Sequence, residues 1–363
     1  MNYAAGRLIH DADSHIMDDP DEVLGYADAA VRTKLEPYTS MVSNGPDHAP
    51  QVLPRTWRHQ QARPLEGAGP ARLPEPACFQ YLRRGVHPGA GERRRSGLRL
   101  RRRALNRYKL DFCSADSRLL PVCYVPLADF GNTEAFAAET LRDGAAALMI
   151  PSACPARHSP SHKALFPLWA RCEEAGIPVV FHVGGQGRDS FNPTYFENGE
   201  PKVRDWLGGD ENFRAVSYMG IPNTAMQTIA TLILDGVFEQ FPRLKLGVVE
   251  MGVSWVPSFL KYMDSSYTAF LRTEDRLRNL TMLPSEYFKR QVRVTLYPTE
   301  DVGWVMRNGG EDVVMFASDL PHAEGGRNPI KRFDASVEAN PDEHETKFYS
   351  DNMLDLIGSA LAS

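Results

Sequence analysis

The sequence predicts an α/β fold in which a parallel sheet is covered by helices. Short apolar runs alternate with amphipathic stretches along most of the 363 residues, which is the pattern of successive strand–helix–strand units. The apolar runs are continuous rather than alternating, as expected for strands that are buried on both faces. The composition, 42% hydrophobic and 24% charged, is typical of a globular protein and excludes a disordered or fibrous chain.

The individual elements follow from these patterns in chain order. Seven apolar runs are predicted as strands, at residues 7–13, 119–126, 145–151, 177–183, 244–250, 291–297 and 312–318. Five stretches between or after them have the apolar spacing of amphipathic helices, at residues 132–143, 163–175, 223–241, 253–265 and 300–308. No repeat or linker divides the chain, so we expect a single domain over residues 1–363.

An unusual segment occupies residues 44–103, where an eight-stranded barrel would need a further strand. Residues 51–107 contain fourteen Arg, three Glu, and no Lys or Asp. The one candidate strand there is ACFQYL at 77–82, so the barrel is expected to be distorted or incomplete around its second strand. The Arg-rich run at 92–103 is interpreted as a solvated loop or a nucleic-acid-binding patch.

A third interpretation is that residues 44–103 are translated out of frame from a GC-rich gene. This hypothesis fails if neither alternative reading frame of the gene encodes an apolar strand–helix segment.

Residues that can bind metal follow several of the predicted strands. Asp13 and His15 alternate with Ser14, so their side chains point to the same side of an extended chain. His182, Glu250 and Asp319 stand at the ends of three later strands, where α/β barrels carry their catalytic groups. Each signal alone also fits a structural residue, but imidazole combined with carboxylate suits Zn²⁺ or Mn²⁺ better than Ca²⁺.

Four motifs in this order resemble a known family. They are Asp11-x-Asp13-Ser14-His15, HVGG at 182–185, Glu250-x-Gly252-x-x-Trp255-x-Pro257, and Ser318-Asp319-x-Pro321-His322-x-Glu324. The chain resembles the amidohydrolase-related family (amidohydrolase 2 type) that includes aminocarboxymuconate-semialdehyde decarboxylase. The resemblance covers residues 1–30 and 104–357. It implies a (β/α)8 TIM barrel, one divalent ion that is expected to be zinc with manganese as the alternative, hydrolysis or non-oxidative decarboxylation, and a homodimer.

The resemblance assigns roles residue by residue. Many members have His-x-His on the first strand, where this chain has Asp13 and His15, and these two with His182 and Asp319 are the implied metal ligands. Asp319 is also the expected proton carrier. Glu250 departs from the family, because decarboxylases often have a catalytic His there, so it is a candidate acid, ligand or substrate-orienting group.

Further candidates lie around this group. His322 is a candidate catalytic residue or a partner that orients Asp319. Arg188, Asn192 and Tyr195 lie in a segment expected to fold over the metal, and are candidate substrate contacts together with Trp255, for which packing at a helix start is the alternative.

Three functions are therefore open. The first is a metal-dependent hydrolase that activates water toward a small organic substrate, and the second is a decarboxylase of an aromatic or unsaturated acid. The third is an inactive barrel or a basic interaction protein, although nucleic acid is not the expected partner.

The sequence also predicts the cellular compartment of the protein. Five scattered cysteines without a CxxC motif, and no recognisable signal peptide or membrane span, indicate a cytoplasmic protein.

Overall fold

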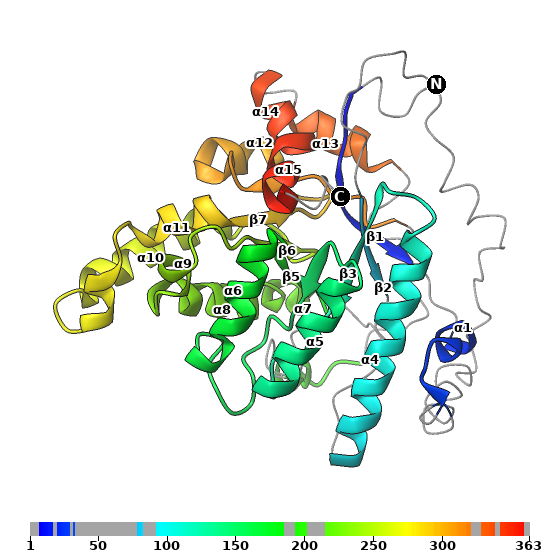
Figure 1. Cartoon of the computed structure of the whole chain (residues 1–363). Helices are drawn as coiled ribbons and strands as arrows, with labels where there is room; N and C mark the ends of the chain where they lie inside the picture. Colours follow the sequence, from blue (N-terminus) through cyan, green and yellow to red (C-terminus); the bar gives the residue numbers. More distant parts are fainter. Residues whose placement is uncertain are drawn as a thin grey trace.

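Eight parallel strands form one sheet in the computed structural model, which describes residues 7–16, 20–29, 32, 78–82, 92–184, 193–201, 215–320, 328–337 and 342–358. Their spatial order follows the chain from β1 to β8, and Figure 1 shows the sheet among its helices, with β1–β3 and β5–β7 labelled. The strands are β1 (Asp11–Ile16), β2 (Cys78–Leu82), β3 (Leu119–Tyr124), β4 (Ala147–Met149), β5 (Val179–His182), β6 (Leu246–Val249), β7 (Val292–Thr295) and β8 (Val314–Met315). The α/β fold and the candidate second strand at 77–82 are thereby confirmed.

Backbone hydrogen bonds join the two edges of this sheet. The Ala12 N–H donates to the Phe316 carbonyl at 3.0 Å, the Asp319 N–H to the Asp13 carbonyl at 2.9 Å, and the His15 N–H to the Leu320 carbonyl at 2.7 Å. The first strand therefore contacts the last strand and the residues after it, as the predicted barrel requires.

Helices follow most strands. The longer ones are α4 (Glu92–Cys113), α5 (Phe130–Arg142), α6 (Phe166–Ala175), α8 (Asn223–Leu234), α10 (Val256–Phe270), α11 (Pro284–Gln291) and α13 (Pro329–Val337). The short ones are α1 (Pro20–Gly25), α7 (Ala215–Gly220), α9 (Val237–Gln240), α12 (Val302–Val305), α14 (Asp342–Thr346) and α15 (Asn352–Ile357). In the described part of the chain, no helix combines the length and apolar character needed to cross a membrane.

Three sequence predictions need correction. The first strand is Asp11–Ile16 and not 7–13, so Asp13 and His15 lie within it. The helix predicted at 223–241 is divided into α8 and α9, because Gly236 takes the left-handed φ of 80° between them. The Arg-rich run at 92–103 forms the first half of α4 rather than a loop.

The C-terminal helix α15 packs into the interior of the sheet. Its Leu356 and Ile357 form a buried cluster with Val180 of β5 and other inward residues. Gly247 of β6 leaves room for this helix, because a Cβ there would lie 2.9 Å from Val180 Cγ1 and 3.1 Å from Leu356 Cδ2. Asn352 Nδ2 also donates to the Val314 carbonyl at 2.6 Å. Helix α15 thus closes the end of the barrel at which β6 and β8 begin.

Candidate metal centre

Strand β1 carries Asp13 and His15 into the centre of the site. Both residues are buried, with exposures of 1% and 3%, and Ser14 between them faces the opposite way along the strand. His15 Nε2 lies 3.2 Å from Asp13 Oδ1 and 3.1 Å from Asp319 Oδ1. Strand β1 and the residues after β8 therefore each place a carboxylate beside the same nitrogen of His15.

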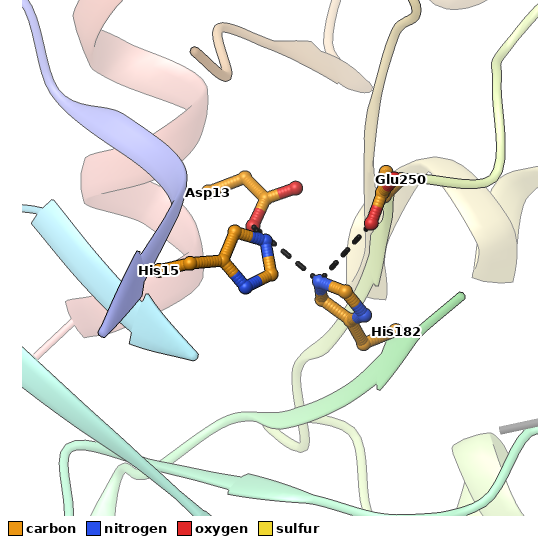
Figure 2. A group of neighbouring side chains, drawn as sticks. All are labelled: Asp13, His15, His182 and Glu250. Carbon is orange, nitrogen blue, oxygen red and sulfur yellow. Dashed lines mark ion pairs between the residues drawn. The ribbon is translucent and has the colours of Figure 1, made fainter. Parts of the chain in front are cut away.

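His182, the last residue of β5, approaches the same point from the other side (Figure 2). Its Nδ1 lies 2.9 Å from the Val183 carbonyl, which assigns the Nδ1 proton to that hydrogen bond. Its Nε2 is then directed at Asp13 Oδ1, 3.5 Å away, and at Glu250 Oε2, 3.4 Å away. A histidine held through one ring nitrogen and presenting the other is the usual arrangement of a metal ligand.

Glu250 and Asp319 share an uncommon backbone conformation. They are the two non-glycine residues with positive φ in the described part of the chain, at 54° and 53°. Such residues cost free energy unless neighbours hold them, and they cluster at functional sites. Here the Glu250 N–H donates to Thr295 Oγ1 at 2.8 Å, and the Tyr297 hydroxyl donates to the Glu250 carbonyl at 2.6 Å. Burial, with the nearby Glu250 charge, raises the pKa of Tyr297, which keeps this hydroxyl protonated as a donor.

The donor atoms converge closely enough for one ion. One ligand atom from each of Asp13, His15, His182 and Glu250 lies within 4.8 Å of the others. Asp319 lies next to this group, with its Oδ1 3.1 Å from His15 Nε2. Two imidazoles with three carboxylates fit a divalent transition metal such as zinc or manganese. The residues present therefore fit the ion that the sequence predicted.

The electrostatics of the group favour positive charge. Burial alone would raise the pKa of Asp13, but the charges of His15 and His182 outweigh it and hold that pKa well below its usual range. Burial alone would lower the pKa of His15, but Asp13 and Asp319 raise it to about 9. The buried carboxylates thus stabilise a cation at this point, either a proton or a metal ion.

Asp11 has a role that the sequence analysis did not assign. It lies on β1 with Asp13, but its carboxylate accepts hydrogen bonds from the Asp13 N–H and from both the N–H and the hydroxyl of Ser318. Burial raises its pKa to about 7, and the bonds from Ser318 oppose that rise. The alternation that placed it beside Asp13 was the only signal in the sequence.

The remaining candidates divide into those the structure places and those it does not describe. Trp255 lies at the start of α10, where its Nε1 donates to the Gly252 carbonyl at 2.7 Å and its ring packs against Phe259, so packing accounts for it. Tyr195, in the short helix Pro193–Phe196, is 71% exposed. Arg188, Asn192 and His322 lie outside the described residues.

The chain matches a known protein family. A family model described as "Amidohydrolase" matches residues 11–357. No curated protein sequence matches the chain.

Solved structures share the fold at low identity. An amidohydrolase from Mycobacterium avium subsp. paratuberculosis K-10 has 23% identity and a TM-score of 0.61, over 78% of this chain and 70% of that one. The 5-carboxyvanillate decarboxylase of Novosphingobium aromaticivorans DSM 12444, with bound manganese and 3-methoxy-4-hydroxy-5-nitrobenzoic acid, has 20% identity and a TM-score of 0.63 over 97% of both chains. A 2,6-dihydroxybenzoate decarboxylase from Rhizobium has 14% identity and a TM-score of 0.61, over 96% of this chain and 98% of that one.

Proposed function

We propose, since this chain belongs to the amidohydrolase family, that its strand-tip cluster holds one divalent ion and hydrolyses a small, uncharged organic substrate. The family makes the chain a metal-dependent hydrolase or carboxy-lyase. The observation that carries the proposal is the convergence of Asp13, His15, His182 and Glu250 on one point, with Asp319 beside them.

The roles of the residues follow from their chemistry. Asp13, His15 and His182 would hold the ion, which when bound supplies the Lewis acidity that makes water nucleophilic near neutral pH. Asp319 would accept the proton of the attacking water and return it to the leaving group. Glu250, 3.4 Å from His182 Nε2, would complete the donor set.

The number of donors bears on which metal is bound. Five side chains exceed the four ligands of a structural zinc site and the three protein ligands of a typical catalytic one. Carboxylate-rich sets suit manganese, and manganese is the ion in the solved decarboxylase from Novosphingobium. We therefore propose manganese ahead of zinc.

Decarboxylation of an aromatic acid is the second candidate, and the decarboxylases with the same fold favour it. The charge of this site argues against it. Among the described residues of the site, three carboxylates outnumber the two charges of a divalent ion when both histidines are neutral, so these residues repel an anionic substrate. A neutral ester, lactone or amide does not.

A basic interaction protein is the least supported function. Arg103 lies 2.7 Å from Glu139, and Arg107 lies 2.7 Å from Asp28. These ion pairs give two arginines of the basic segment partners within the fold.

The compartment proposed is the reducing cytoplasm. Cys113, Cys123, Cys154 and Cys172 are free thiols, as expected in a reducing compartment.

The test is metal analysis of the purified full chain followed by assays on matched substrates. Neutral esters, lactones and amides are compared with aromatic and unsaturated carboxylic acids, with detection of released CO₂. Hydrolysis that needs the added metal supports the proposal. Metal-dependent CO₂ release without hydrolysis assigns the decarboxylase, and a folded chain that takes up neither manganese nor zinc refutes both.

A further inference from the structure

Asp11 joins the first strand of the barrel to the residues that follow the last one. Its Oδ1 accepts hydrogen bonds from the Asp13 N–H at 3.1 Å and from the Ser318 N–H at 2.9 Å. Its Oδ2 accepts from the Ser318 hydroxyl at 2.5 Å. One carboxylate therefore binds the backbone of Asp13 and the residue directly before Asp319.

We infer that Asp11 is a positioning residue that fixes the two carboxylates Asp13 and Asp319 on either side of the metal centre. This inference rests on the proposed function, because it assigns Asp11 and Ser318 to the support of that same centre. Neither side chain is a member of the converging group, so both act through the residues that they hold.

The conformation of Asp319 shows why support is needed. Its φ of 53° is one that L-residues adopt rarely, so the direction of its side chain depends on neighbours that hold the backbone. The Asp319 N–H donates to the Asp13 carbonyl at 2.9 Å. The Leu320 N–H donates to the Ser318 hydroxyl oxygen at 3.2 Å. The hydrogen bonds from Ser318 to Asp11 fix the start of this turn.

The chemistry of Asp11 matches its surroundings. All three groups that face its oxygens are donors, and a carboxylate is the side chain that offers acceptors alone. An asparagine could keep all three hydrogen bonds, because its NH₂ group can donate to the Ser318 hydroxyl oxygen, whereas alanine removes both acceptor oxygens. Residues that support metal ligands typically change metal affinity 10- to 100-fold when they are replaced.

The chain offers a matched control between two outer helices. Ser285 of α11 donates its N–H to Asp264 Oδ1 at 2.9 Å and its hydroxyl to Asp264 Oδ2 at 2.7 Å. This repeats the Ser318–Asp11 pattern, but it joins α10 to α11. Replacing Ser318 or Ser285 by alanine removes, in each case, a hydroxyl that donates to an aspartate.

The experiment measures Mn²⁺ affinity and metal-free stability on the same variants of the full chain. Metal is removed with a chelator, Mn²⁺ is titrated back and followed calorimetrically, and unfolding by urea is measured without metal. We expect Ser318→Ala to weaken Mn²⁺ binding about 10-fold and Asp11→Ala, which removes all three hydrogen bonds, about 10- to 100-fold. We expect Ser285→Ala to keep the wild-type affinity, although it lowers metal-free stability as Ser318→Ala does.

The outcomes separate this inference from the proposed function. If wild type binds Mn²⁺ and Ser318→Ala binds it within twofold of wild type, the positioning role is overturned and the metal centre stands. The same conclusion follows if Ser318→Ala and Ser285→Ala weaken binding equally. If wild type binds neither Mn²⁺ nor Zn²⁺, the proposed function fails and this inference fails with it.

Discussion

Replacing Asp319 by asparagine separates holding the metal from moving the proton. The change exchanges one carboxylate oxygen for an NH₂ group and preserves size and one oxygen ligand. Asparagine is also among the few residues that readily adopt positive φ, so the backbone at φ 53° is retained. The perturbation is therefore confined to the charge and basicity of one side chain.

The expected magnitude follows from the geometry. Four other donors, from Asp13, His15, His182 and Glu250, still converge within 4.8 Å, so most of the metal should remain bound. An amide cannot accept a proton near neutral pH, so the loss should appear in turnover. General acid–base groups contribute about 10²- to 10⁴-fold, which corresponds to about 2.7–5.4 kcal/mol of barrier.

The assay compares kcat, KM and metal content on the same preparations of wild type, Asp319→Asn and Glu250→Gln. We expect Asp319→Asn to retain metal and lose turnover. Glu250→Gln should be milder if Glu250 only completes the donor set, and comparably severe if it transfers the proton. Near-normal turnover by metal-loaded Asp319→Asn would refute the role of Asp319 as proton carrier and assign that role to Glu250.

Four further outcomes are expected. His182→Ala removes the imidazole that β5 supplies and should lower metal occupancy, measured by elemental analysis; full occupancy would exclude His182 as a ligand. Leu356→Ala opens a cavity in the buried barrel end and should cost about 2–5 kcal/mol in urea unfolding while leaving metal content unchanged; a cost below about 1 kcal/mol would show that α15 is not part of the core. Burial lowers the pKa of His10 from 6.5 to about 4, so the unfolded state binds the proton first as the pH drops. The stability should therefore fall between pH 6.5 and pH 4, by up to about tenfold in the folding equilibrium per pH unit. His10→Asn should flatten this pH dependence, and an unchanged slope would show that another group causes it. Finally, we expect a homodimer, and a single monomeric species by light scattering at micromolar concentration would contradict this.

The interior strands were predictable because their sequences are apolar throughout. The run at 177–183 contains β5, and the run at 244–250 contains β6, since strands buried on both faces leave no other pattern. Strand β1 was placed four residues early at its start, because its segment DADSHI is polar. Those polar residues are buried by the site they build, which local sequence does not reveal.

The convergence of Asp13, His15, His182 and Glu250 could be predicted from the sequence, and the support that Asp11 gives to their neighbours could not. His182 and Glu250 stand directly at strand ends, and parallel strands bring their ends together. Asp11 and Asp13 have the same chemistry in the sequence, and in the structure they differ through a register shift of β1 between Asp11 and Ser14 and through the hydrogen bonds of Asp11 with Ser318, 307 positions away. No local pattern encodes such a pairing, because it arises only when the last strand meets the first.

The meeting of the first and last strands also decides when the site can exist during synthesis. The backbone N–H that the Asp13 carbonyl accepts belongs to Asp319, about 300 residues later in the chain. A nascent chain that has not reached residue 319 contains His15 and His182 but lacks the Asp319 carboxylate. The full donor set therefore assembles only after residue 319 has been synthesised, and an ion bound there would link the two ends of the barrel across this long loop, whose closure carries a large entropic cost.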